Sequence, residues 1–343
     1  MELLKGVTLL LAALTAFSLF SRYAPKGSKA MGGLASAAVA SFLVEAVHAY
    51  ISGDFLGIAL LKETGLAAGS MGGPAAAALV ALALGANPVF ALVAAIATKG
   101  TGILAGFIAG YICYFIADII ERHLPEGIDI IAGALILAPC AYILSNTSGP
   151  LVDNVMNIIG AAITEATNAS PYVMGFLLGG LIKMICTSPL SSMALTAILG
   201  LTGLPMGIAA IACVGGSFTN GMIMKRLKLG DNNKVIAIML EPLTQADIVT
   251  RNAFKVYSCN FFGGALSGVV AVYFNIINNA PGTAAPIPGL LAPFAFNEAS
   301  AVLMAIVGAA ICGIIAGYIG TSIHLKIDKL RTEKASQAKA IPA

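Results

Sequence analysis

The chain has 343 residues, of which 58% are hydrophobic and only 10% are charged, and its formal net charge is +3. Soluble domains average about 25% charged residues, so this composition excludes a water-soluble protein. The small net charge gives no indication of nucleic-acid binding, and no nucleic acid is expected as a partner. The alternating pattern of an outer-membrane barrel is also missing, so we expect an all-α polytopic membrane protein.

Long uncharged runs set the expected number of membrane spans. A spanning helix needs about 20 apolar residues, and several runs reach or exceed that length. These runs are Thr64–Thr98, Gly100–Ala117, Ile130–Val152, Met184–Met224 and Ala299–Leu325. The length rule predicts about 8–10 spans, some of them re-entrant or broken hairpins, in one transmembrane domain over residues 1–325. A basic cytoplasmic tail is expected over residues 326–343.

The N-terminal segment Met1–Phe20 is interpreted as the first membrane helix. It contains Lys5 and then an apolar stretch, but Arg22 and Tyr23 follow where a signal peptide would have a cleavage site. Basic residues mark the cytoplasmic side of a membrane protein. They form three clusters here: Arg22, Lys26 and Lys29; Lys225, Arg226, Lys228 and Lys234; and Lys326, Lys329, Arg331, Lys334 and Lys339.

Glu45 and His48 are the first polar pair within an apolar stretch. They lie three residues apart, which places them on one face of an α-helix. Such a pair can bind substrate, relay protons or satisfy each other's hydrogen bonds, and the sequence leaves these alternatives open.

Three interruptions follow along the chain. Gly72, Gly73 and Pro74 are expected to divide the long run Thr64–Thr98. Glu121–Asp129 is expected to be a solvated loop between spans. Asn154–Thr164, flanked by charges, is too short to span and is interpreted as an amphipathic helix at the membrane surface.

The run Met184–Met224 is expected to contain a broken or re-entrant element, a helix to about residue 200, and a turn over 200–205. Non-helical backbone at membrane depth requires protein or water around it, and transporters use it to present polar groups to substrate. The candidate substrate contacts are Thr187, Ser188, Ser191 and Ser192. An alternative is that Thr187 or Ser188 caps a helix that begins near Pro189. Lys183 either pairs with a buried carboxylate or extends to the membrane surface, and the second interpretation is preferred.

The segment Glu241–Asn252 is the strongest candidate site. It places polar and charged residues between apolar segments, and Val256–Asn297 has no charged residue at all. Pro242 indicates a broken helix or hairpin tip. The candidate substrate-binding residues are Glu241, Thr244, Gln245, Asp247 and Asn252. Their donors and acceptors suit a polyol, because a carboxylate accepts charge-assisted hydrogen bonds from hydroxyls. The alternative is a solvated loop without a ligand.

Other chemistry is not indicated. The six cysteines are isolated in apolar sequence and the three histidines are scattered, so neither a disulfide framework nor a metal site is expected. No nucleotide-binding Walker motif or catalytic triad occurs, and no cofactor is expected.

The chain resembles the membrane (IIC) component of bacterial phosphotransferase-system sugar transporters, especially the compact group that includes the PfoR proteins. Gly106–Tyr111 followed by Leu124–Ile128 resembles the GFLAGY passage of fructose-type IIC proteins. Thr187–Ala194 resembles the SPIST-A segment of the compact group. Glu241–Asp247 followed by Gly263–Leu266 resembles the fructose-type GITEGAIPFA…GGAL passage.

The resemblance implies that Glu241 matches the family's sugar-binding glutamate. It also implies a homodimer, a scaffold with a mobile transport domain, and an elevator-like movement in a bacterial cytoplasmic membrane. Pro286–Pro293 lacks the histidine of the fructose-type PHGG segment. A sugar phosphotransferase role would require IIA and IIB proteins on separate chains. The alternatives are a secondary carrier of the same fold, coupled to H⁺ or Na⁺, and a membrane solute sensor.

Overall fold

The computed structural model describes residues 2–188 and 191–339, and every regular element in these ranges is helical. The first elements are α1 (Glu2–Tyr23), α2 (Gly27–Ala38), the π-helices η1 (Val39–Leu43) and η2 (Ala46–Phe55), α3 (Ala59–Gly69), α4 (Gly72–Leu84), α5 (Pro88–Ala97), α6 (Ile103–His123) and α7 (Ile128–Ala169). The remaining elements are α8 (Pro171–Thr187), α9 (Ser192–Ile198), α10 (Gly203–Arg226), α11 (Asn232–Leu240), the 3₁₀-helix η3 (Pro242–Gln245), α12 (Ala246–Arg251), α13 (Ala253–Tyr273), α14 (Pro286–Leu291), the 3₁₀-helix η4 (Ala292–Ala295) and α15 (Ala299–Lys339).

The described helices confirm the expected class, an all-α polytopic membrane protein. Seven of them are long and apolar enough to cross a membrane, or up to eight when the bent pair α3–α4 counts as one span. The sequence predicted at least about eight spans. The structure reaches eight only when α3 and α4 are counted together as one span. The bend between α3 and α4 is 55°, at the glycine-rich break expected before Pro74. The turn expected over 200–205 also occurs, because α9 ends at Ile198 and α10 begins at Gly203.

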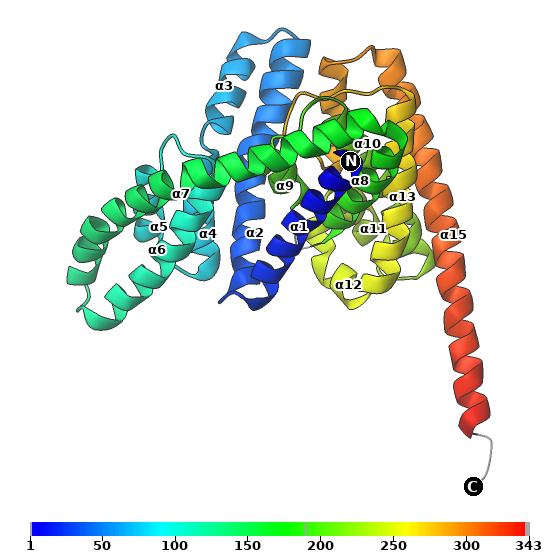
Figure 1. The fold of residues 1–343 in the computed structure, drawn as a ribbon. Helices are drawn as coiled ribbons and strands as arrows, with labels where there is room; N and C mark the ends of the chain where they lie inside the picture. The colour runs from blue at the N-terminus through cyan, green and yellow to red at the C-terminus, as the bar shows by residue number, and fades with distance from the viewer. Residues whose placement is uncertain (1, 189–190, 340–343) are drawn as a thin grey trace.

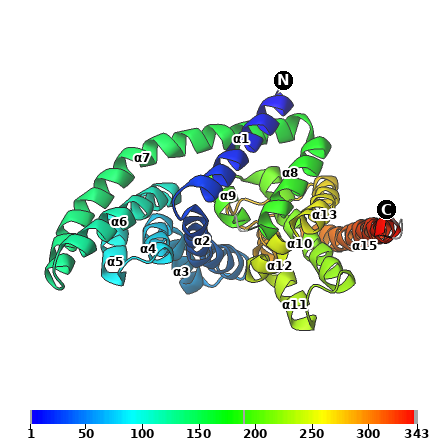
Figure 2. The same cartoon turned by 90° about the horizontal axis from the view of Figure 1, so that it is seen from below.

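The helices form two groups (Figures 1 and 2). The first group contains α2, α4, α5, α6 and the first part of α7. The second group contains α8, α10, α13 and α15, with α11 and α14 against α10. Figure 2 shows α7 as one long helix that passes both groups, with α1 beside it. The boundary expected at residue 325 falls inside α15, and the cytoplasmic tail beyond it stays a prediction.

The second group has a tightly packed interior. α10 is almost wholly buried among its neighbours. Gly175 and Gly179 of α8 face Gly264 and Gly268 of α13, so each helix carries a small-xxx-small spacing. A Cβ atom added at Gly268 would lie 2.1 Å from the carbonyl oxygen of Gly175. Glycines thus allow the two backbones to touch, as membrane helices do where small residues line the interface.

The expected short surface helix over Asn154–Thr164 is wrong. This segment continues the preceding span without a break, and α7 passes through both Pro139 and Pro150. The charged residues Asp153 and Glu165 lie on the exposed side of α7 and therefore do not end it. Prolines persist in membrane helices because local adjustments and neighbouring groups satisfy the freed backbone atoms.

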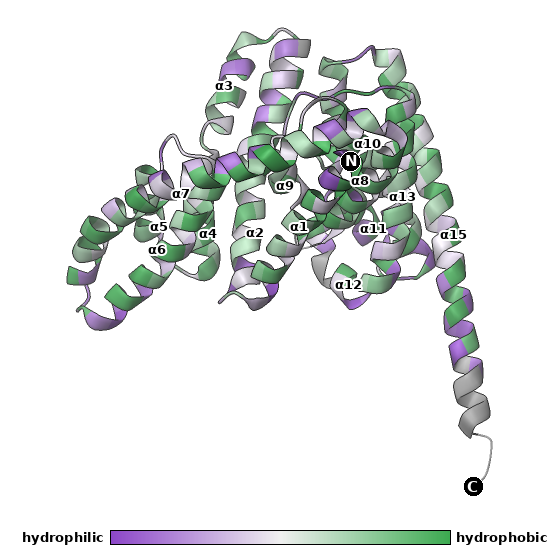
Figure 3. Cartoon of the chain, viewed as in Figure 1, coloured by the Kyte–Doolittle hydropathy of each residue, from purple (hydrophilic) through white to green (hydrophobic). Residues whose placement is uncertain are grey.

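Several segments that carry basic residues lie at one end of the molecule. Figure 1 shows the α1–α2 turn, α12 and the C-terminal end of α15 at the same end of the molecule. Figure 3 shows hydrophilic residues on the lower parts of α6 and α15, and others on α3 and along α7. By the positive-inside rule, the basic residues of the α1–α2 turn, α12 and α15 predict that their end of the molecule faces the cytoplasm.

We expect Asp231→Ala to loosen α11, the helix that leads to Glu241. Asp231 is the N-cap of α11, and its side chain accepts a hydrogen bond from the Lys234 amide at 2.9 Å. Loss of such a cap costs about 1 kcal/mol. Amide hydrogen exchange across α11 should therefore accelerate roughly fivefold. Asp231→Asn retains the cap and is the control; equal exchange in the two variants would contradict this role.

Candidate functional site

Three polar segments of the second group come together around α10. They are the α8–α9 connection, the α11–α12 connection, and the extended segment between α13 and α14. The Ser192 hydroxyl donates a hydrogen bond to the Ala284 carbonyl at 2.5 Å, which joins the first of these segments to the third. The Ser217 hydroxyl of α10 donates to the Met239 carbonyl at 2.7 Å, which holds the end of α11 against α10. Broken helices that meet within a buried helix group are typical of a transporter substrate site.

Glu241 lies where α11 ends and η3 begins, as the position of Pro242 indicated. Its backbone is extended, with φ −144° and ψ 94°, and its side chain is half-buried. The Leu243 amide donates a long hydrogen bond of 3.4 Å to the Glu241 carboxylate. η3 packs against α8, which brings Glu241 close enough to interact electrostatically with Lys183. A carboxylate in this position retains acceptor capacity for the hydroxyl groups of a ligand.

The other predicted residues of this segment lie around the same turn. Thr244 is exposed, donates to the Glu241 carbonyl at 2.8 Å, and lies 3.4 Å from the Gln245 amide nitrogen. Asn252 sits between α12 and α13 and donates to the Ile248 carbonyl at 3.0 Å. The side chain of Asp247 lies outside the described part of the structure. Glu241, Thr244 and Gln245 are thus neighbours, whereas Asn252 follows one helix later.

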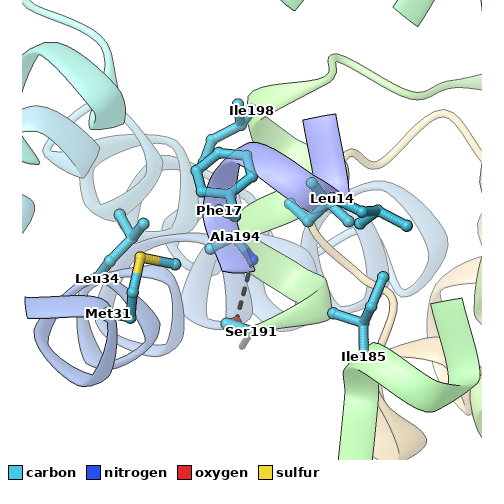
Figure 4. Close-up of a pocket in the computed structure, with 9 residues that line it drawn as sticks. Leu14, Phe17, Met31, Leu34, Ile185, Ser191, Ala194 and Ile198 are labelled. Atoms are coloured by element: carbon cyan, nitrogen blue, oxygen red, sulfur yellow. Dashed lines mark hydrogen bonds between the residues drawn. The ribbon is translucent and has the colours of Figure 1, made fainter. Parts of the chain in front are cut away.

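The hydroxyl residues of the α8–α9 connection divide between two roles. Thr187 and Ser188 donate back to the Lys183 and Ile185 carbonyls, each at 2.8 Å. The expected cap at Thr187 or Ser188 is wrong, because Ser191 is the N-cap of α9 and accepts from the Ala194 amide at 3.2 Å. Figure 4 shows this bond beside a cavity. Residues 189 and 190 of the predicted tip lie outside the described residues.

That cavity lies at the junction of the two helix groups and is apolar. Leu14 and Phe17 of α1 point into it from one side, and Met31 and Leu34 of α2 line the other (Figure 4). Ile185 of α8 and Ser191, the N-cap of α9, complete the lining. The contact between the groups at this point is therefore formed by apolar side chains with few hydrogen bonds.

Lys183 is the principal residue that sequence reasoning placed wrongly. Extension to the membrane surface was the preferred interpretation, but Lys183 is 0% exposed. Its aliphatic stem lies over Gly216 of α10 and Gly264 of α13, whose missing side chains provide the space. Its ammonium nitrogen has no hydrogen-bond partner among the described residues. The sequence feature that could have indicated burial of Lys183 is the pair of glycines, Gly216 and Gly264, on the later helices α10 and α13.

A buried amide pair was also missed. Asn260 of α13 donates to the side-chain oxygen of Asn220 on α10 at 2.8 Å, and both residues are fully buried. Each was a single amide in an apolar run, and neither carries a spacing pattern. This bond links the two central helices of the second group.

Glu45 and His48 lie away from this cluster, and no hydrogen bond or ion pair among the described residues joins them to Glu241. Their helix is largely π-helical, so hydrogen bonds run from i to i+5 and the expected α-helical face is wrong. Glu45 instead interacts electrostatically with Tyr50, five residues later, and its carboxylate lies over Gly69 of α3. The Nδ1 atom of His48 is buried and has no hydrogen-bond partner among the described residues.

These features define a class of protein. A multi-pass membrane protein whose broken helices bring buried polar groups together is a membrane transporter by architecture.

Comparison with protein families makes the assignment specific. The family model described as Phosphotransferase system, EIIC, matches residues 28–338. The chain belongs to this family, and its general function is that of a sugar-transport permease. No curated protein and no solved structure matched the chain. The closer resemblance to the compact and fructose-type groups stays a prediction.

Proposed function

We propose that this chain is a permease of the bacterial cytoplasmic membrane that binds a small polyhydroxylated solute, a sugar or sugar derivative, at Glu241. The observation that carries the proposal is the half-buried Glu241 carboxylate at a helix break, which interacts electrostatically with the fully buried Lys183. An ionised group inside a membrane protein is unfavourable unless protein, water or a ligand compensates it, and such groups mark transport sites.

The bonding capacity of the site suits hydroxyl groups. The Glu241 carboxylate accepts only the long bond from Leu243 among the described hydrogen bonds, which leaves acceptor positions for two adjacent hydroxyls. Thr244 and Gln245 beside it provide further donors and acceptors. Ser191 and Ser192 stand on the opposing connection. Charge-assisted bonds to the carboxylate would supply both affinity and direction.

We further propose an elevator-like movement of the second helix group against the first. The polar segments belong to the second group, whereas the junction near Leu14, Phe17, Met31 and Leu34 is apolar. An apolar contact with few hydrogen bonds can slide without breaking many directional interactions. The homodimer implied by the family resemblance would hold the first group still.

Binding is tested by thermal unfolding of the purified protein against neutral sugars, sugar acids and small carboxylates without hydroxyls. A ligand at about 100 times its Kd stabilises the folded protein by about 2.7 kcal/mol, which is a measurable shift. We expect at least one polyhydroxylated compound to raise the unfolding temperature. If only carboxylates without hydroxyls do so, the proposed solute class is wrong.

We expect transport to depend on separate IIA and IIB proteins. The family assignment supports such partners, because EIIC is one component of the phosphotransferase system. Proteoliposomes with the purified chain should accumulate phosphorylated solute only when IIA, IIB and a phosphate donor are supplied. Accumulation of unmodified solute without them would contradict this coupling.

A secondary carrier of the same fold is the second candidate. Glu45 and His48 favour it, because both lie in a candidate membrane span and no described residue hydrogen-bonds the Nδ1 atom of His48. Coupling of this kind predicts uptake that collapses with an uncoupler or in sodium-free buffer. Uptake that survives both treatments excludes it, and the same proteoliposomes therefore separate the two mechanisms.

A further inference from the structure

Lys183 lies inside the second helix group and is the most unusual charged residue of the chain. It is 0% exposed and belongs to α8, one helical turn before Thr187. Adding a Cβ atom to Gly216 would place it 2.1 Å from the Cδ and Cε atoms of Lys183. The same addition at Gly264 would approach the Lys183 Cβ atom to 2.3 Å. Because Gly216 and Gly264 have no side chains, they leave a space that the aliphatic part of Lys183 fills closely. This packing fixes the position of the ammonium group.

The ammonium group of Lys183 has no close partner among the described side chains. No hydrogen-bond partner and no carboxylate within 4.0 Å is found for its nitrogen among the described residues. Glu241 acts on it electrostatically, but from beyond ion-pair distance. A buried charge without a close partner strongly destabilises a folded protein, and a well-packed apolar residue of similar volume would remove that penalty. A lysine buried in this way therefore points to a partner that arrives during function.

The surroundings of Lys183 connect it to the proposed site. Electrostatic interactions relate it to Glu241 and to the Cys186 thiol. The Cys186 thiol lies within hydrogen-bonding reach of Cys213 and of Ser192. Ser192 in turn bonds the Ala284 carbonyl. Lys183 thus interacts electrostatically both with Glu241, at the end of α11, and with the Cys186 thiol next to Ser192.

We propose that the transported solute is a polyhydroxylated monocarboxylate, such as an aldonic or uronic acid, whose carboxylate binds Lys183 while its hydroxyls bind Glu241. This inference rests on the proposed function and assigns the substrate class of the same site. Lys183 offers hydrogen-bond donors to an anionic end of the solute, and the Glu241 carboxylate offers acceptors to neighbouring hydroxyls. A monocarboxylate adds one negative charge to a site that already holds Lys183 and the Glu241 carboxylate, whereas a phosphate dianion would add two.

The test compares matched pairs of compounds on the wild-type protein. Gluconate is paired with glucitol and glucuronate with glucose, and apparent Kd values come from thermal unfolding at increasing ligand concentration. We expect each acid to bind at least tenfold more tightly than its neutral partner. If the neutral compounds bind equally well or better, the carboxylate proposal is overturned and the general sugar site stands. If no polyhydroxylated compound binds, both proposals fail.

A variant separates ligand binding from a structural role. Lys183→Met keeps the length of the side chain and removes its charge, with exposed Lys99→Met as the matched control. Without ligand, Lys183→Met should unfold at the wild-type temperature or above, because it removes an uncompensated buried charge. Its ratio of apparent Kd values, neutral compound over acid, should also fall at least tenfold relative to the wild-type protein. A large fall in unfolding temperature would instead identify Lys183 as a structural ion-pair partner and overturn the proposal.

Discussion

Glu241→Gln is expected to reduce solute uptake to background while the protein remains folded. The substitution preserves the shape of the side chain at the α11–η3 break but replaces a charged acceptor by a neutral amide. Hydrogen bonds to charged groups contribute about 1.5–3 kcal/mol each. Loss of one such bond lowers affinity roughly 10- to 150-fold, and two adjacent hydroxyls would lose two. Uptake measured below the Kd of the wild-type protein reports this loss directly.

The matched control for this prediction is Glu126→Gln. Glu126 is an exposed residue in the turn between α6 and α7, so the same chemical change there removes one negative charge without touching the site. Size-exclusion profiles and unfolding temperatures of both variants should match the wild-type protein. Wild-type uptake by Glu241→Gln would show that Glu241 does not bind the solute, whatever the remaining family resemblance.

Much of the architecture could be predicted because lipid leaves few alternatives. Every backbone group in the bilayer must be satisfied within the protein, so long apolar runs become helices and their breaks become hairpins. The break before Pro74 and the turn before Gly203 follow from that rule. The continuity of α7 did not follow, because exposed charges at Asp153 and Glu165 resemble the ends of a span. Whether such charges mark the end of a helix or lie on its exposed face depends on how α7 packs along both helix groups, and that packing cannot be seen in the local sequence.

The candidate site was predictable where the polar residues are contiguous and was missed where they are spread over several helices. Glu241, Thr244 and Gln245 occupy one turn, so the local sequence was sufficient. Lys183 depends on Gly216 and Gly264, which belong to two other helices, and a single charged residue near the end of an apolar run does not reveal whether it extends outward. The position of Glu45 depends on a π-helix, for which residue spacing gave no signal.

Substitution of Gly268 by alanine is expected to destabilise the protein although alanine is the better helix former. In an open helical position, glycine to alanine stabilises by about 0.5–1 kcal/mol. At Gly268 the new methyl group would lie 2.1 Å from the Gly175 carbonyl oxygen and 3.1 Å from the Gly179 Cα atom. These are backbone atoms of α8, so no side chain can move aside and the two helices must separate. Overpacking of this kind costs typically 1–3 kcal/mol, and Gly268→Leu should prevent recovery of folded protein.

The sign of this effect is tested against Gly32→Ala, because Gly32 of α2 is exposed and a Cβ atom there meets nothing within 4 Å. Helix propensity alone predicts the same gain in unfolding temperature for both variants, whereas backbone contact predicts a loss at Gly268 alone. Separation of α8 from α13 would also loosen the packing of the Lys183 side chain against Gly264, because Gly264 and Gly268 belong to the same helix contact. Gly268→Ala should therefore weaken solute binding as well as stability, and a variant that is destabilised but binds normally would show that this helix contact does not position Lys183.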